Sequence, residues 1–183
     1  MARFINFASY NLHGFQQGKP QLLNLCDSHD VIAIQEHWLS NCDLDRIVNL
    51  HNDFIVVAKS AMSEKTQTGF LRGRPFGGVA VMVKKSVASK VNMVGISDKC
   101  RCLAVMITLH GGYKMLIIDV YFPCYEPGQE YQSALLDCIG FIENCIVLND
   151  HDAVMILGDC NFECDNSHAG YKMFKKICAV NIN

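Results

Sequence analysis

The sequence lacks a large excess of charge of either sign. Its 183 residues include 16 lysines and arginines and 18 aspartates and glutamates, which gives a formal net charge of -2 at pH 7. The molecule as a whole therefore attracts a polyanion only weakly, and any binding of nucleic acid depends on a local basic patch. The best candidate is the loop "GFLRGRPFGG", with Arg72 and Arg74 as substrate-binding residues. An exposed loop with two solvated arginines accounts for the same residues equally well.

The sequence also lacks the features of a secreted or membrane-spanning protein. The amino-terminal stretch "MARFINFASYNLHG" has no apolar middle followed by a small-residue cleavage site, and no apolar run approaches the length that crosses a bilayer. We therefore expect an intracellular protein, nuclear or cytoplasmic, without a membrane partner. The ten cysteines fit this expectation. Several lie in apolar runs and no two pairs have the spacing of a zinc site, which predicts free thiols in a reducing compartment.

No repeat, low-complexity tract or linker divides the chain, so residues 1–183 are expected to form one domain. Runs rich in Val, Ile and Phe predict strands at 4–9, 31–35, 54–58, 79–83, 103–109, 114–121 and 153–157. Apolar residues at three-and-four spacing predict a long helix between 130 and 150, and shorter helices are predicted at 21–26, 44–50 and 169–178. Gly111 and Gly112 predict a hairpin turn. The pattern indicates a mixed, layered α/β protein.

Polar side chains follow several of these strands at their carboxyl ends. The run 153–157 is wholly aliphatic and predicts a central strand with both faces covered, and Asp159 and Asn161 follow it two positions apart. Asn11 follows the first strand, Glu36 follows the second, and Tyr121 ends the sixth. If these strands lie side by side, the five side chains share one cleft. Taken singly, each is explained more simply by a turn, a strand end or a core aromatic.

Together, the five side chains suit hydrolysis of a phosphodiester. Mg²⁺ prefers oxygen ligands, which Glu36 and Asn11 can supply. Asp159 can orient and deprotonate the attacking water. Asn161 and Tyr121 can donate hydrogen bonds to phosphoryl oxygens as negative charge develops there.

Three further side chains are weaker candidates. Asp119 lies two positions before Tyr121 on the same strand face and could add a carboxylate to the cleft, although a satisfied polar strand residue is the simpler interpretation. Phe76 and Trp38 could stack on DNA bases. For Trp38, the only tryptophan of the chain, buried packing is the simpler prediction.

Five motifs, in this order, resemble those of the endonuclease/exonuclease/phosphatase superfamily: "SYNLHG", "IAIQEHWL", "FGGVAVMVKK", "DVYFP" and "MILGDCNFE". The wording of "IQEHWL" and "GGVAVMV" is most similar to the endonuclease domains of non-LTR (LINE-type) retrotransposons. The resemblance implies a four-layer α/β sandwich, in which two packed mixed sheets are flanked by helices. It also implies cleavage of a phosphoester with Mg²⁺ or Mn²⁺. For the retrotransposon type, DNA is the substrate and a full-length parent can carry a reverse transcriptase domain.

The resemblance assigns roles to the same five residues. Asn11 and Glu36 match the asparagine and glutamate of the metal site. Tyr121 matches the tyrosine that contacts phosphate. Asp159 matches the aspartate that activates the nucleophile, and Asn161 matches the asparagine that orients it.

The sequence departs from the family pattern in two places. His13 stands where many members carry Asp or Asn. The later strands and the terminal Ser-Asp-His motif of the family have no counterpart here, which predicts a domain truncated before its last strands and at best weak activity. Three functions follow: a DNA endonuclease of retrotransposon type, a non-catalytic remnant or binding module, and a phosphoesterase of the same superfamily that acts on a lipid, an inositol phosphate or RNA.

Overall fold

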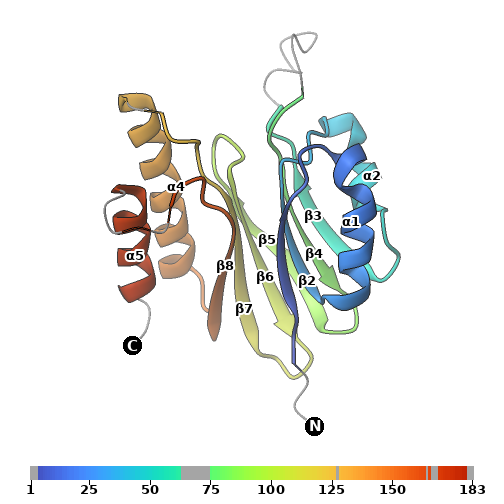
Figure 1. Ribbon diagram of the computed structural model, residues 1–183. Helices are drawn as coiled ribbons and strands as arrows, with labels where there is room; N and C mark the ends of the chain where they lie inside the picture. The colour runs from blue at the N-terminus through green and yellow to red at the C-terminus, as the bar shows by residue number, and fades with distance from the viewer. Residues whose placement is uncertain (1–3, 63–74, 127, 164, 166–168, 181–183) are drawn as a thin grey trace.

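Two four-stranded sheets pack face to face, and helices cover their outer faces (Figure 1). The computed structural model describes residues 4–62, 75–126, 128–163, 165 and 169–180. Within these residues the predicted four-layer α/β sandwich is confirmed.

Each sheet contains one parallel pair of strands, and its other pairs are antiparallel. Sheet A has the order β1 (Phe7–Asn11), β2 (Val31–Gln35), β4 (Val79–Lys84) and β3 (Phe54–Lys59). Sheet B has the order β5 (Ala88–Ile96), β6 (Cys102–Leu109), β7 (Lys114–Tyr121) and β8 (Ala153–Asp159). The parallel pairs are β1 with β2 and β7 with β8.

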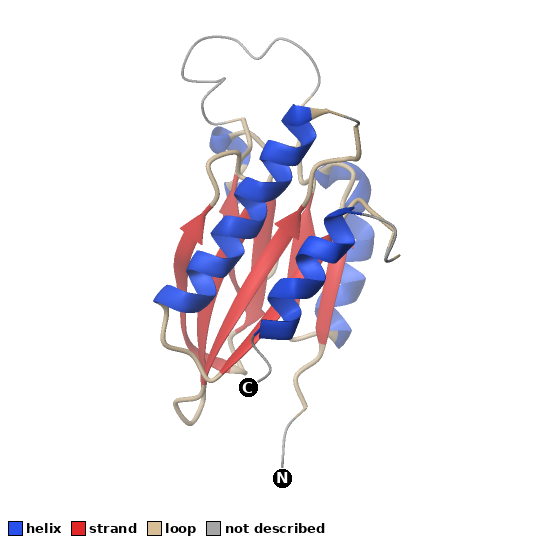
Figure 2. Ribbon diagram, turned by 90° about the vertical axis from the view of Figure 1, so that its left-hand side faces the viewer, coloured by secondary structure: helices blue, strands red, loops and turns tan. Residues whose placement is uncertain are grey.

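The helices form the two outer layers. Helix α1 (Phe15–Ser28), the short turn η1 (Asn41–Asp43) and α2 (Asp45–Val48) lie beside sheet A, whereas α4 (Gln129–Leu148) and α5 (Ala169–Val180) lie beside sheet B. Figure 2 views the molecule from the side of α4 and α5, which lie in front of the strands of sheet B and run roughly along them. Three apolar cores result: one under each helical layer and one between the sheets.

Strand β7 shows how alternate side chains serve two of these cores. Leu116, Ile118 and Val120 pack beneath α4, whereas Ile117 faces sheet A. Successive side chains of a strand point to opposite faces, and here both faces are covered. This double burial explains the continuous aliphatic run from which the strand was predicted.

Several predicted elements are confirmed, and three need correction. The hairpin at Gly111 joins β6 to β7, and the long helix appears as α4. Strand β5 was missed because its outer face is polar and exposed, as at Lys90 and Asn92. The prediction for α1 was wrong at its start, since the helix begins at Phe15 and includes Pro20.

The third correction concerns β8, which was predicted to be central. It is the outermost described strand of sheet B, and all seven of its residues are only half-buried. Its aliphatic composition therefore reflects packing on one side against the inter-sheet core and on the other against the α4 layer, not strands on both edges.

Helix α4 is long and apolar enough to cross a membrane by length and composition alone, contrary to the sequence-based expectation. Its apolar residues at three-and-four spacing, including Leu135, Ile139, Ile142 and Ile146, are buried against sheet B. This packing is that of the core helix of a folded domain.

Candidate active site

Strands β1 and β8 lie against each other across the two sheets, and their carboxyl ends meet. Asn11 is the last residue of β1 and Asp159 is the last residue of β8. Glu36 directly follows β2, the parallel partner of β1. The topology therefore brings residues that are far apart in the sequence to one end of the sandwich.

Asn11 lies between the two carboxylates. Its Nδ2 donates to Glu36 Oε1 over 3.0 Å and to Asp159 Oδ2 over 2.9 Å. Its Oδ1 accepts the backbone N–H of His13 over 3.1 Å. With the carbonyl oxygen occupied by the backbone, the amide presents both N–H groups to the acids and offsets the repulsion between their charges.

Both oxygens of Glu36 have partners. The indole Nε1 of Trp38 donates to Oε2 over 3.2 Å, and His13 Nδ1 lies 3.5 Å from the same oxygen. The Glu36 side chain is 13% exposed, whereas that of His13 is 71% exposed. Glu36 has a φ of 54°, in the left-handed region that non-glycine residues rarely adopt. Such backbone strain persists where the surrounding contacts impose it, often at functional sites.

Gly158 explains why the aliphatic run of β8 stops before Asp159. Its φ is 146°, and a Cβ atom there would lie 1.9 Å from the carbonyl oxygen of Val120, its register partner on β7. Only glycine permits so close an approach. The close pairing of β7 and β8 therefore fixes the position of Asp159 beside Tyr121 at the carboxyl ends of the two strands.

Asn161 turns back toward the same carboxylate. Its backbone N–H donates to Asp159 Oδ1 over 3.0 Å, and its Nδ2 donates to the carbonyl oxygen of Phe122 over 2.8 Å. Its φ is 49°, a conformation that asparagine tolerates better than most residues. Both oxygens of Asp159 are thus held by N–H donors, and the second N–H of the Asn161 amide remains a potential donor.

Tyr121 completes the cluster from the end of β7. Its hydroxyl lies near the carboxylate of Glu36, close enough for the two groups to interact. Burial, and next the hydrogen bond to Glu36 and the charge of that carboxylate, raise the pKa of Tyr121 well above its usual value. The guanidinium carbon of Arg101 lies 5.6 Å from the ring centroid. Tyr121 therefore stays protonated at neutral pH and acts as a hydrogen-bond donor.

Asp119 does not lie in this cleft. It is fully buried between the sheets, where Gln35 donates to its Oδ1 over 2.5 Å. Burial raises the pKa of Asp119 far above its usual value, with the hydrogen bond from Gln35 acting in the opposite direction. Ser9 in turn donates to Gln35 over 3.4 Å. This chain links β1, β2 and β7 one layer beneath the residues that end those strands.

His37 is a supporting residue that was not identified from the sequence. It is fully buried, its Nδ1 accepts the N–H of Leu39, and its Nε2 donates to the carbonyl oxygen of Lys59, both over 3.0 Å. Burial lowers the pKa of His37 to about 4, so the ring is neutral. It ties the loop after β2 to the end of β3. Its place directly after Glu36 in "IQEHWL" was the available signal.

The residues present suit a hard divalent cation. The carboxylates of Glu36 and Asp159 supply oxygen donors, the type that Mg²⁺ and Mn²⁺ prefer. Within the described residues no group of three or more His, Cys, Asp and Glu could hold a metal ion. The metal-binding roles of Glu36 and Asn11 therefore stay predictions. Arg72 and Arg74, predicted to bind substrate, lie outside the described residues.

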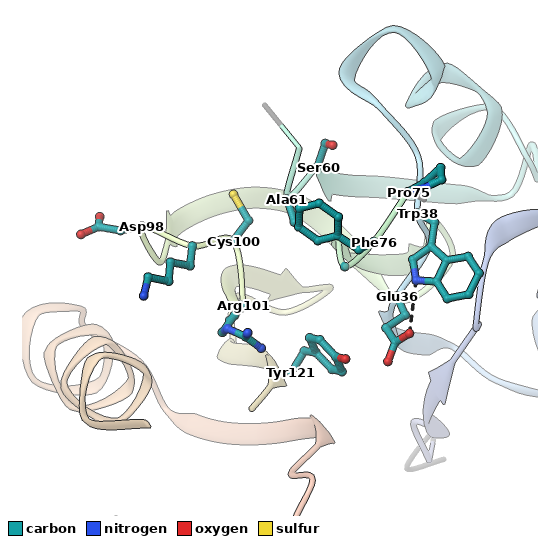
Figure 3. Close-up of a pocket in the computed structure, with 12 residues that line it drawn as sticks. Glu36, Trp38, Ser60, Ala61, Pro75, Phe76, Asp98, Cys100, Arg101 and Tyr121 are labelled. Atoms are coloured by element: carbon teal, nitrogen blue, oxygen red, sulfur yellow. Dashed lines mark hydrogen bonds between the residues drawn. The ribbon is translucent and has the colours of Figure 1, made fainter. Parts of the chain in front are cut away.

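A cavity of about 440 Å³ opens beside Glu36 (Figure 3). Sheet A contributes residues that follow β2, follow β3 and precede β4, and sheet B contributes Tyr121 and the turn between β5 and β6. Trp38 and Phe76 lie on one side of it and Arg101 and Tyr121 on another. The expected burial of Trp38 is corrected, because this side chain is half-buried and lines the cavity.

The cluster and the fold agree with a family comparison. Residues 8–169 match the model of the Endonuclease/Exonuclease/phosphatase family. The chain belongs to this family. No curated protein is significantly similar to it in sequence.

Solved structures of several activities share the fold of this family member. A 3′ phosphatase, NExo, from Neisseria, bound to a product DNA hairpin, has a TM-score of 0.66 and 16% identity over 97% of this chain and 71% of that chain. The AP endonuclease LMAP from Leishmania major has a TM-score of 0.64 and 13% identity over 96% of this chain and 66% of that chain. The human Nocturnin catalytic domain, with a bound sulfate anion, has a TM-score of 0.61 and 15% identity over 98% of this chain and 70% of that chain. The chain spans 66–71% of the lengths of these structures.

Proposed function

We propose that this protein is a divalent-metal-dependent phosphodiesterase that cleaves DNA, an endonuclease of retrotransposon type. The observation that carries the proposal is the pair of carboxylates, Glu36 and Asp159, joined by one Asn11 amide at the meeting ends of β1, β2 and β8. Two acids at fixed positions can take separate roles, one in binding a cation and the other in accepting a proton.

In this proposal Asp159 accepts the proton of the attacking water. Its two oxygens are oriented by Asn11 and by the Asn161 backbone, so the carboxylate needs no rearrangement before it acts. The neutral Tyr121 hydroxyl and the Asn161 amide donate hydrogen bonds to the phosphoryl oxygens as charge develops. Glu36 would hold the Mg²⁺ or Mn²⁺ ion, which supplies charge neutralisation at the phosphate when bound. Asn11 would join it as an oxygen ligand only with its amide turned over, because here its Oδ1 accepts the His13 N–H and its Nδ2 faces the two carboxylates.

The choice of DNA rests on two supports. A 3′ phosphatase bound to a DNA hairpin and an AP endonuclease share the fold. The motifs "IQEHWL" and "GGVAVMV" resemble those of retrotransposon endonuclease domains. Fold alone leaves the substrate open, because one fold hosts many chemistries.

The test is nicking of supercoiled plasmid with Mg²⁺ or Mn²⁺ by the 183-residue chain and by two isosteric variants, Glu36→Gln and Asp159→Asn. Each variant should lower the nicking rate by about 100-fold or more, because it removes a cation ligand or a proton acceptor. Glu143→Gln, on the exposed face of α4, is the matched control and should leave the rate unchanged. Nicking that survives both active-site substitutions would contradict the proposal.

A second candidate is a non-catalytic DNA-binding module. The 183 residues contain no Ser-Asp-His sequence, and loss of one preorganised contact to the phosphate lowers rates by about 10²- to 10³-fold. We therefore expect a polypeptide of these residues alone to nick DNA slowly. Absence of nicking by a folded chain that binds DNA favours this second candidate.

A further inference from the structure

The cavity beside Glu36 has the composition of a site for one nucleotide. Its volume of about 440 Å³ lies within the range of pockets that enclose small ligands, ~300–1,000 Å³. Trp38 and Phe76 supply aromatic surface, Lys99 and Arg101 supply positive charge, and Glu36 and Asp98 supply two carboxylates. Phe76 is 40% exposed, an unusual state for a large apolar ring in a concave site. Aromatic rings beside cations are the combination that binds unpaired nucleotides, through the base and the phosphate respectively.

The indole of Trp38 is held in place from two directions. A Cβ atom on Gly14 would lie 2.6 Å from Cε3 of the indole, so the ring packs directly on that glycine backbone. Its Nε1 donates to Glu36 Oε2 over 3.2 Å. A ring fixed in advance loses little conformational entropy when a base stacks on it. The same hydrogen bond links the aromatic wall of the cavity to a carboxylate of the candidate active site.

The cationic wall is also ordered. The Arg101 guanidinium stacks on the ring of Tyr121, with 5.6 Å between its central carbon and the ring centroid. This cation–π contact holds the guanidinium at the boundary between the cavity and the catalytic cluster. From there its planar set of donors can reach a phosphate next to the one that Tyr121 contacts.

Backbone strain is concentrated around the same cavity. Five non-glycine residues of the described chain have a positive φ. Three of them, Glu36, Trp38 and Cys100, line the cavity, and the other two, His13 and Asn161, lie at the catalytic cluster. Strain of this kind costs conformational free energy and clusters at ligand clamps and active sites. Its distribution marks the cavity as part of the functional surface.

From these observations we infer that the cavity binds one unpaired nucleotide of the DNA substrate, adjacent to the cleaved phosphodiester. The base stacks on Trp38 and Phe76, and the phosphate of that nucleotide contacts Arg101 and Lys99. A base that is stacked and paired within a duplex cannot enter a cavity of this size, so the site favours DNA with an unpaired residue. The inference rests on the proposed function, because it assigns a subsite to the same substrate.

The test uses Trp38, the only tryptophan of the chain, as its own reporter. The 183-residue protein is titrated, in EDTA so that no cleavage occurs, with a duplex that contains one unpaired thymidine and with a fully paired duplex of equal length. The first duplex should quench the tryptophan fluorescence and bind at least about 5-fold more tightly than the second. Equal affinity and equal quenching for the two duplexes would overturn the inference.

Three variants separate stacking from charge. Phe76→Ala should weaken binding of the bulged duplex by about 5-fold or more and leave binding of the paired duplex unchanged. Arg101→Gln should weaken binding of both and reduce the slope of log affinity against log salt by about 1. Tyr113→Ala, which removes an exposed ring in the β6–β7 turn at the opposite end of β7, should change neither. Unchanged binding in Phe76→Ala would also overturn the inference.

The outcomes are distinguishable from those of the nicking assay. Selective quenching by the bulged duplex without any metal-dependent nicking contradicts only the proposed catalysis. Nicking that depends on Asp159, combined with equal binding of the two duplexes, contradicts only the nucleotide subsite.

Discussion

The side-chain amide of Gln35 donates a 2.5 Å hydrogen bond to the Asp119 carboxyl across the space between the two sheets. Gln35 directly precedes Glu36, and Asp119 lies two residues before Tyr121. The contact therefore fixes the position of β2 relative to β7 along the strand direction. Glu36 and Tyr121, which follow at the carboxyl ends of these strands, both belong to the candidate active site. The contact also leaves Asp119 Oδ2 without a hydrogen-bond partner among the described residues.

Because the Asp119 side chain is fully buried, its contribution to the stability of the fold depends on pH. Its pKa in the folded protein is raised well above the ordinary value of 3.8, so the folded state keeps the proton to higher pH than the unfolded chain does. Asp119 therefore stabilises the fold less as the pH rises above about 4. Asp119→Asn should raise the free energy of unfolding by about 1–3 kcal/mol at neutral pH. Denaturant titrations should find that this gain shrinks toward pH 4, and a variant less stable than the wild type at neutral pH would contradict the assignment.

His37 acts in the opposite direction. Its pKa is lowered from 6.5 to about 4, so between these values the unfolded chain binds a proton that the folded state does not. Stability should therefore fall as the pH drops through this window, by on the order of 3 kcal/mol at its lower end. Unfolding of the wild type and His37→Gln, measured from pH 6.5 to 4, should show a shallower pH dependence in the variant. Parallel curves would refute the role of His37.

Gly158 should resist any side chain. Gly158→Ala places a Cβ against the Val120 carbonyl, at 1.9 Å before relaxation, in a backbone conformation that disfavours alanine. We expect a loss of about 1–3 kcal/mol or more in stability, together with displacement of Asp159 and loss of nicking activity. Gly140→Ala on α4 is the control, since no atom lies within 4 Å of its added Cβ. Similar thermal midpoints for the two variants would show that β7 and β8 can separate at little cost.

Trp38→Phe separates the two roles of the indole. Phenylalanine keeps an aromatic face but cannot donate to Glu36 Oε2. Removal of a hydrogen bond to a charged group costs about 1.5–3 kcal/mol, so kcat should fall by about 10-fold while affinity for DNA with an unpaired residue changes little. Trp38→Ala should lower both. A fall in affinity alone in Trp38→Phe would argue against the coupling between the cavity and Glu36.

The sequence predicted best those strands that are buried on both faces. β2 and β7 appear as continuous aliphatic runs because each face meets a separate core. In β5 only Ala88 is buried, exposed and half-buried residues follow it without alternation, and the register shifts near Ala88 and Met93, so the strand gives no clear period of two. β8 was correctly predicted as a strand but wrongly placed at the centre of its sheet. An aliphatic run indicates that both faces of a strand are covered, and it does not indicate whether the strand has a neighbour on each edge.

The same distinction applies to the candidate site. Asn11, Glu36, Tyr121 and Asp159 could be predicted because each closely follows or ends a recognisable strand, and the topology then brings them together. Arg101 was missed because its place depends on the turn after β5, the strand that was also missed. Trp38 is half-buried and has a positive φ, and a sequence pattern reveals neither property.

The Asn11 amide joins Glu36, 25 residues away along the chain, to Asp159, 148 residues away. Contacts of such separation form late in folding, because the entropy of closing the long loop is lost before the contact can compensate for it. The amide bridge should therefore be absent from an early intermediate in which only the amino-terminal β1–β4 unit has formed. During synthesis, the chain would carry its acidic centre only after β8 has docked beside β7, so that a partly folded chain holds no assembled cleavage site.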